Sequence, residues 1–352
     1  MSDTPIVPPV PGILPETEKH MFDLSATQGP LAGLGGSPVP GPKWFVEAVA
    51  SEPESNFVSV EGAQIHYLRW GSRARPGILL VHGNAAHARW WSFIAPFLAR
   101  DYNVAAMDLS GMGDSDWRAD YSMEVFSREQ LAVCEDAGMF AAGGKPMIIA
   151  HSFGGFVTML TGGRHGDRLA GTMILDSPVN PPSRSENGRG GSEPIRHDPR
   201  PHNIYPSLAA ALARFRLMPP QFCENLFLLD WVARHSLKEV PLKDVAGQKG
   251  QAGGEPGFTW KFDPAIWRRF SIGDTEALLK ATRCRIAVLR GEHSVLMPPA
   301  IHEYIFNLLG RAAPVIEIPE AQHHIMLDQP LALVAALRAL LADWEHSVAN
   351  RR

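Results

Sequence analysis

A serine flanked by small residues stands where an apolar run gives way to a helix-like pattern. The segment reads Ala150-His151-Ser152-Phe153-Gly154 and directly follows Met-Ile-Ile. A serine at a sharp turn from a strand to a helix projects its hydroxyl, and the helix dipole there favours developing negative charge. Small residues are needed beside it because the turn is crowded, although Ala150 stands where glycine is usual. The pattern predicts that Ser152 is a nucleophile.

The backbone that would stabilise an oxyanion is indicated by His82-Gly83-Asn84, which ends an apolar run earlier in the chain. The chain must turn there with an N–H group free to point at a developing negative charge. We expect the N–H groups of Asn84 and Phe153 to form an oxyanion hole, because the residue after the nucleophile supplies the second donor in this geometry. His82 is predicted to brace the loop through hydrogen bonds rather than to transfer protons.

A general base is expected late in the chain, in a loop that follows the last strand. The segment AQHHIMLDQP, at 321–330, offers His323 and His324 directly after an apolar run. A neutral imidazole can accept the serine proton and return it to the leaving group near pH 7. These residue types alone leave the choice between the two histidines open.

The segments around these motifs are short apolar runs separated by amphipathic stretches of helical length. Ile, Val, Leu and Met on successive positions are typical of strands that are covered on both faces. The first two runs are joined by only a Glu-Gly turn and should pair antiparallel, whereas the later runs alternate with helices, which favours parallel crossovers. The sequence predicts an α/β fold with helices on both faces of a mostly parallel eight-stranded sheet, at 57–60, 63–70, 77–83, 102–109, 145–152, 171–179, 284–291 and 314–321.

Two regions depart from this alternation. Nine prolines among the first 42 residues prevent long regular elements, so we predict an extended arm that a short helix at 44–54 joins to the core. A second region contains no convincing strand but has two apolar helical stretches, at 207–218 and 221–237, and is predicted to form a helical cap over the end of the sheet. The predicted arm, the two parts of the core and the cap are 1–55, 56–179 with 271–352, and 180–270.

Taken in order, these motifs resemble the α/β-hydrolase superfamily over about residues 56–345. The likeness runs through HGN, DLSGMGDSD, AHSFGG, a long insertion, RGEHS and AQHHIMLDQP. The family usually has Ala-Gly-His before a helix that starts with proline, so the resemblance implies that His323 is the base, with Gln322 in place of the glycine. His324 is then expected to be a neighbour of the base.

The acid of the triad is where this chain departs from the family's common pattern. Most members have an aspartate three residues after the glycine that ends the seventh strand, whereas here Gly291 is followed at that position by Ser294. A histidine base still needs an acceptor for its Nδ1–H, which fixes the tautomer. Asp176 lies 24 positions after Ser152, at the end of the sixth strand, as in haloalkane dehalogenases and zearalenone-type lactone hydrolases. Asp176 is therefore the predicted acid, and Glu292 is the alternative acid.

The resemblance implies a serine esterase or lactonase that forms an acyl-enzyme with a moderately sized, mostly apolar substrate. Three alternatives remain: a C–C bond hydrolase of ring-cleavage products, a cofactor-free dioxygenase and a hydrolase-derived ligand receptor. Related epoxide hydrolases and haloalkane dehalogenases use an aspartate nucleophile, so a serine argues against both. Aromatic residues of the cap either line the substrate site or only pack the cap, and those predicted to bind substrate are Trp231, Phe227 and Trp260.

The composition limits the partners. The 352 residues include 33 basic and 37 acidic side chains, and a net charge of −4 provides no basic field for nucleic acid or anionic lipid. Three scattered cysteines argue against a disulfide framework or a structural zinc site, and no metal or cofactor is predicted. Neither a signal peptide nor a membrane span is visible, so we expect a cytoplasmic protein that acts on a small-molecule ester or lactone. A homodimer is left open.

Overall fold

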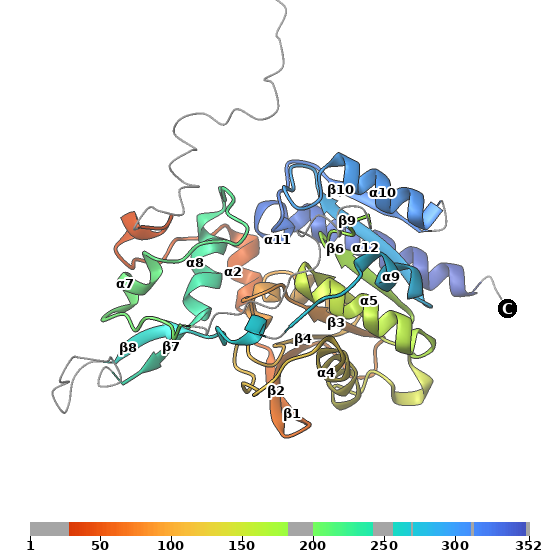
Figure 1. Ribbon diagram of the computed structural model, residues 1–352, viewed down its shortest axis with the longest axis horizontal. Coiled ribbons are helices and arrows are strands. Elements are labelled where there is room, and N and C mark those ends of the chain that lie inside the picture. Colours follow the sequence, from red (N-terminus) through yellow and green to blue (C-terminus); the bar gives the residue numbers. More distant parts are fainter. Residues whose placement is uncertain (1–27, 182–199, 242–255, 269, 311–312, 350–352) are drawn as a thin grey trace, which may run out of the picture.

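One eight-stranded sheet forms the centre of the computed structural model, which describes residues 28–181, 200–241, 256–268, 270–310 and 313–349 (Figure 1). The strand order is β1-β2-β4-β3-β5-β6-β9-β10. β2 pairs antiparallel with β1 and with β4, and the remaining neighbours are parallel, which confirms the predicted fold class. The strands are β1 (Glu54–Val60), β2 (Ala63–Trp70), β3 (Gly77–Val81), β4 (Asn103–Met107), β5 (Met147–His151), β6 (Gly171–Leu175), β9 (Arg285–Gly291) and β10 (Val315–Ile318).

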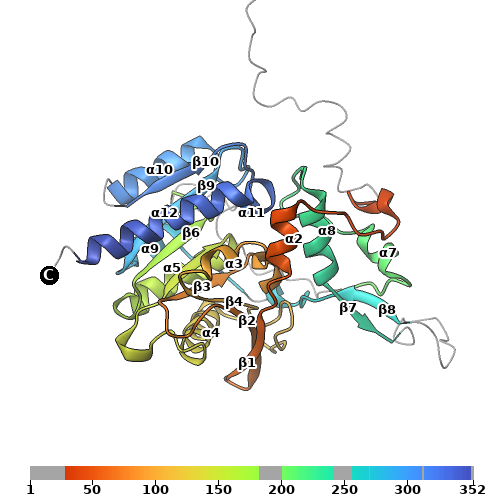
Figure 2. The same ribbon diagram turned by 180° about the vertical axis from the view of Figure 1, so that it is seen from behind.

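Helices cover both faces of this sheet (Figures 1 and 2). The helices of one layer are α4 (Met123–Asp136), α5 (Phe153–His165) and α9 (Thr275–Ala281), with α10 (Pro299–Leu309) towards the sheet edge. The helices of the other layer are α3 (Ala95–Leu98) and α12 (Pro330–Ala349). Among the helices of the described residues, none combines the length and the apolar character needed to cross a membrane.

β3 shows how an uninterrupted apolar run serves both layers. Leu79 and Val81 belong to the hydrophobic cluster that includes α4 and α5, whereas Ile78 and Leu80 belong to the cluster that includes α3 and α12. Successive side chains of a strand point to opposite faces, so a strand covered on both sides has to be apolar throughout.

The cap contains a small second sheet, so the prediction that this region has no strand is wrong. β7 (Leu237–Val240) pairs antiparallel with β8 (Gly257–Trp260), beside the helices α7 (Leu208–Leu212) and α8 (Leu226–His235). β7 reads Leu-Lys-Glu-Val and has no apolar run. It forms a strand by pairing with β8, which lies further along the chain, so the search for apolar runs does not detect it. α7 and α8 fall within the predicted helical stretches but are shorter. Three parts of the predicted cap lie outside the described residues: 182–199, 242–255 and position 269.

The N-terminal arm lies against the cap, as far as the structure describes it; its residues 1–27 are outside the described part. The backbone N–H of Gly29 donates a hydrogen bond to the carbonyl of Ala213 at 2.6 Å. Arg234 Nη2, on α8, donates to the carbonyl of Gly36 at 2.7 Å. These contacts attach the arm to α8 and to the residue that follows α7, and Figure 1 shows the arm beside these elements.

α2 (Lys43–Val49) continues the arm towards the core and covers the first part of the joining helix predicted at 44–54, whose last residue, Glu54, instead begins β1. Phe45 of this helix is buried, and its ring centroid lies 5.0 Å from that of Phe227 and 5.8 Å from that of Trp231, both on α8. The ring of Phe93, in the core, lies 6.3 Å away. The arm, the cap and the core therefore meet in one cluster of aromatic rings around Phe45.

Candidate active site

Ser152 lies at the turn between β5 and α5, at the carboxyl edge of the sheet. Its backbone is in a left-handed conformation, with φ 51° and ψ −119°, which is costly for a residue with a side chain and projects the hydroxyl from the turn. A Cβ atom on Gly154 would lie 2.5 Å from the carbonyl oxygen of His82, so the turn requires glycine at this position. Ala150 is fully buried on β5, where its small methyl group fits.

The three residues predicted to form a triad meet at this edge. His323 Nε2 lies 3.0 Å from Ser152 Oγ, and His323 Nδ1 lies 2.6 Å from Asp176 Oδ2. Ser152 is half-buried, whereas His323 and Asp176 are buried. Asp176 directly follows β6, and His323 lies in the loop between β10 and α11 (Ile325–Asp328). In this arrangement Asp176 accepts a hydrogen bond from Nδ1–H, so the lone pair of Nε2 is directed at the serine hydroxyl.

Asp176 is held by two donors from the end of β9. The N–H of Gly291 donates to Oδ1 at 3.0 Å, and Ser294 Oγ donates to Oδ2 at 2.5 Å. These bonds fix the orientation of the carboxylate against the imidazole. The sequence analysis assigns no role to Ser294. The available signal is its position, because most members of the family have their acid there.

Glu292, the alternative acid, is engaged elsewhere. Its Oε2 accepts a hydrogen bond from the backbone N–H of Glu320 at 3.0 Å and lies 3.9 Å from His293 Nε2. No hydrogen bond between described residues joins Glu292 to His323. The structure therefore brings Asp176, and not Glu292, to the histidine.

The two N–H groups predicted to form an oxyanion hole have no hydrogen-bond acceptor within the described chain. Phe153 is the first residue of α5, and Asn84 lies in the loop after β3. His82 Nδ1 donates to the carbonyl of Gly83 at 2.7 Å, and its Nε2 accepts the N–H of Leu109 at 3.1 Å. Both ring nitrogens of His82 are thus used to brace the loop.

A cavity of about 200 Å³ opens between the cap and the loop after β3. Asn84 and His324 line it from the core, and Met218, Trp260 and Phe262 are among the cap residues that line it. Of the aromatic residues predicted to bind substrate, Trp260 is the one that lies here. The cavity is therefore placed where a substrate in contact with the Asn84 loop would extend beneath the cap.

Trp231 and Phe227, which are also predicted to bind substrate, do not line this cavity. Both rings pack on Phe45, and Trp231 Nε1 donates a hydrogen bond to the carbonyl of Arg89 at 3.2 Å. Both side chains therefore attach α8 to the arm. Aromatic residues serve packing as well as substrate binding, so residue type alone does not distinguish the two roles.

The loop that carries His323 is hydrogen-bonded to the cap. Gln221 Oε1 accepts the backbone N–H of His324 at 2.9 Å, and Gln221 Nε2 donates to both carboxylate oxygens of Asp328 at 3.0 Å. Asn225 Nδ2 donates to the backbone carbonyl of Asp328 at 3.0 Å. Burial raises the pKa of Asp328 to about 7. Hydrogen bonds from Gln221 and Asn225 thus connect the cap to the loop that carries His323.

Comparison with known protein families leads to the same fold class as the sheet, the serine turn and the order of the motifs. The chain belongs to the α/β hydrolase family, whose model matches residues 78–337. This match includes the serine turn, the cap insertion and the histidine loop.

Individual relatives match in part. Lipase LipV of Mycobacterium tuberculosis is 30% identical over 115 residues, which are 33% of this chain and 42% of the lipase. Epoxide hydrolase 3 of Xenopus tropicalis is 23% identical over 156 residues, 43% of this chain and 41% of the relative. The chain therefore spans less than half the length of these curated relatives. The crystal structure of an esterase from Mycobacterium tuberculosis has a TM-score of 0.60 at 20% identity, covers 88% of this chain and 95% of the esterase, and has the same fold.

Proposed function

We propose that this protein is a serine hydrolase that cleaves a carboxylic ester or lactone through an acyl-enzyme. The observation that carries the proposal is the continuous hydrogen-bonded series from Ser152 Oγ through His323 to Asp176. The family membership and the names of relatives, which include a lipase and an esterase, support hydrolysis as the class of reaction.

In the proposed first step, Ser152 Oγ attacks the substrate carbonyl carbon and its proton passes to His323 Nε2. The carbonyl oxygen becomes an oxyanion that accepts hydrogen bonds from the N–H groups of Asn84 and Phe153, where preorganised donors stabilise the developing charge. Asp176 stabilises the imidazolium through Nδ1. The C–O bond to the leaving group breaks as His323 returns the proton to that oxygen, which leaves an acyl group on Ser152.

The second step repeats this chemistry with water. His323 Nε2 accepts a proton from water as the water oxygen attacks the acyl carbon, and the same proton then passes to Ser152 Oγ as the acyl bond breaks. The products are a carboxylic acid and the alcohol released earlier. With a lactone, both groups remain in one molecule.

The identity of residue 152 separates this proposal from epoxide hydrolysis. An epoxide hydrolase of this fold forms an ester between an aspartate nucleophile and the substrate, whereas Ser152 has a hydroxyl at that position. The similarity to epoxide hydrolase 3 is therefore not extended to its reaction.

Covalent labelling tests the proposal. A fluorophosphonate probe should label the full chain once, and Ser152→Ala should lose both the label and the hydrolysis of p-nitrophenyl esters and lactones. Ser72→Ala, which changes an exposed serine far from the turn, is the matched control and should retain both. Labelling that persists in Ser152→Ala would reject the assignment. A wild-type protein that is labelled but does not hydrolyse esters would favour one of the alternatives. Oxygen uptake would then indicate the dioxygenase, and loss of dienoate colour would indicate the C–C bond hydrolase.

A further inference from the structure

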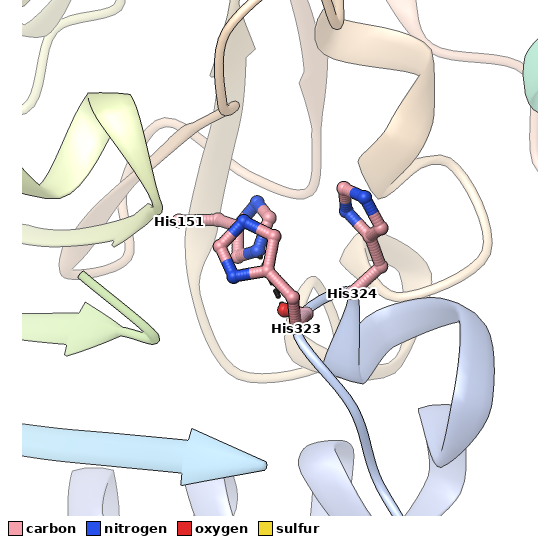
Figure 3. A group of neighbouring side chains, drawn as sticks. All are labelled: His151, His323 and His324. Carbon is pink, nitrogen blue, oxygen red and sulfur yellow. Dashed lines mark hydrogen bonds between the residues drawn. The ribbon is translucent and has the colours of Figure 1, made fainter. Parts of the chain in front are cut away.

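Three imidazole rings meet beside the serine turn. His151 ends β5, and His323 and His324 are consecutive in the loop before α11 (Figure 3). One ring nitrogen from each residue lies within 4.8 Å of the others. The ring centroids of His151 and His323 are 4.7 Å apart, and those of His323 and His324 are 4.8 Å apart. Only one of the three rings, that of His323, is needed by the proposed reaction.

Hydrogen bonds select the tautomer of two of these rings. His151 Nε2 must donate its proton to the backbone carbonyl of His323, 2.9 Å away, so its Nδ1 has a lone pair. His323 Nδ1 donates to Asp176, so its Nε2 has a lone pair as well. Both rings therefore present one nitrogen in the form that binds a metal ion.

The third ring, His324, has two buried nitrogens and no hydrogen-bond partner for either among the described residues. The residue is 5% exposed, and the backbone of Met218 lies beside the ring. An unpartnered buried polar group is destabilising, so its presence in a native structure requires an explanation.

One of the three rings borders the cavity under the cap, and a glycine lies beside another. A Cβ atom on Gly83 would lie 3.0 Å from His151 Nδ1, so a side chain at this position would crowd the nitrogen. His324 lines the cavity under the cap, through which an ion can enter. A tetrahedral zinc ion with bonds of about 2.0 Å holds its nitrogen ligands roughly 3.4 Å apart, so the three nitrogens, which lie within 4.8 Å of one another, have to move closer together to bind one.

From these observations we infer that His151, His323 and His324 form a binding site for a divalent transition-metal ion such as Zn²⁺, and that the bound ion inhibits the protein. The ion takes the lone pair of His323 Nε2, which the proposed hydrolase reaction needs to accept the serine proton. Asp176 supports the ligand from behind, because a carboxylate on the second nitrogen orients a metal-binding imidazole and raises its basicity. Imidazole ligands favour Zn²⁺, Cu²⁺ and Ni²⁺ over Mg²⁺ and Ca²⁺.

Isothermal titration with Zn²⁺ alone tests the site without relying on activity. The full chain, freed of any affinity tag and treated with chelator, should bind one equivalent at this site. His324→Phe keeps the ring packed against Trp90, whose centroid is 5.3 Å away, and should weaken binding by about tenfold or more, since one of three ligands is lost. Mg²⁺ should produce no binding.

Two matched variants locate the ion. The surface group Glu292, His293 and Glu320 is another set that could hold a metal, and His293→Ala removes its imidazole. Ser152→Ala frees His323 Nε2 from its hydrogen bond, so it should bind Zn²⁺ at least as tightly as the wild type. Zn²⁺ binding that is unchanged in His324→Phe, or lost in His293→Ala, overturns the inference, as does the absence of binding to the wild type.

A measurement on the wild type removes any dependence on how the variants fold. In ¹⁵N-histidine spectra, Zn²⁺ should shift the ring signals of His151, His323 and His324 and leave those of His293 in place. Zn²⁺ should also slow fluorophosphonate labelling, and chelator should restore it. This labelling result rests on the proposed function, whereas Zn²⁺ binding to Ser152→Ala does not, so the two proposals can fail separately.

Discussion

Ser294 Oγ donates a hydrogen bond to Asp176 Oδ2 at 2.5 Å, which joins the ends of two neighbouring strands. β6 and β9 pair in parallel, with Leu175 opposite Leu289, so residues just beyond either strand reach the same point at the carboxyl edge of the sheet. In this chain the carboxylate comes from the end of β6, and a serine from the end of β9 holds it. The two positions therefore meet at one point of the sheet edge.

The first prediction concerns the carboxylate itself. Asp176→Asn preserves the shape of the side chain but removes the negative charge and favours the wrong histidine tautomer, so kcat should fall by about 10,000-fold. Glu292→Gln is the matched control, because the carboxylate of Glu292 accepts a hydrogen bond from Glu320 and shares none with His323 among the described residues, and its kcat should stay close to that of the wild type. Steady-state kinetics on a p-nitrophenyl ester measures both, and the opposite ranking would transfer the role to Glu292.

The second prediction concerns the serine that holds the carboxylate. Ser294→Ala removes a hydrogen bond to a charged group, which contributes about 1.5–3 kcal/mol, so kcat/KM should fall by roughly tenfold or more. Unchanged kcat/KM would show that Gly291 alone orients Asp176.

A third prediction moves the acid between the two strand ends. Ser294→Asp extends the side chain by about one atom towards His323 Nδ1, and it should restore part of the activity that Asp176→Asn loses. The test compares kcat of the double variant with that of Asp176→Asn alone. Equal rates would mean that the end of β9 does not reach the histidine in this chain.

The fourth prediction concerns the contact that joins arm, cap and core. Phe45→Ala removes a buried aromatic ring that packs on Phe227, Trp231 and Phe93, and the free energy of unfolding should fall by about 3–5 kcal/mol. Val46→Ala, at the next position, is the control, since Val46 is 53% exposed and its replacement should change stability by less than about 0.5 kcal/mol. Denaturant unfolding curves compare the two, and similar midpoints would contradict the proposed packing role.

The fifth prediction concerns pH. Burial raises the pKa of Asp328 to about 7, so the folded protein retains a proton that the unfolded chain, with an ordinary pKa of about 3.8, has already released. This carboxyl group should therefore reduce stability progressively as the pH rises from about 4 to 7. Asp328→Asn cannot titrate, so its stability should fall less than that of the wild type across this range. Parallel pH profiles of the free energy of unfolding would exclude a raised pKa.

Local patterns were enough for the parts of the molecule that local chemistry defines. The eight strands were predicted because each is a short apolar run, and the position of Ser152 was predicted because a strand, a crowded turn and a helix follow one another within a few residues. His323 was chosen by its place in a family motif, and the structure brings it within 3.0 Å of Ser152.

Other parts depend on contacts between distant segments, which no local pattern encodes. β7 and β8 lack apolar runs and become strands because they pair with each other. Trp231 and Trp260 are both aromatic residues of the cap, yet the first packs on the arm and the second lines the cavity. The serine at 294 acquires a role only because the sheet places β9 beside β6.

The sequence by itself determined the fold class, the turn that exposes Ser152 and the two candidates for the acid, since these follow from residue type, spacing and motif. Only the tertiary structure decided between the candidates. Asp176 and Glu292 both lie at strand ends near the histidine loop, and direction separates them: one carboxylate faces the imidazole at 2.6 Å, and the other accepts a backbone hydrogen bond from Glu320. A side chain's direction is set by the packing of neighbouring strands, which is a property of the folded chain.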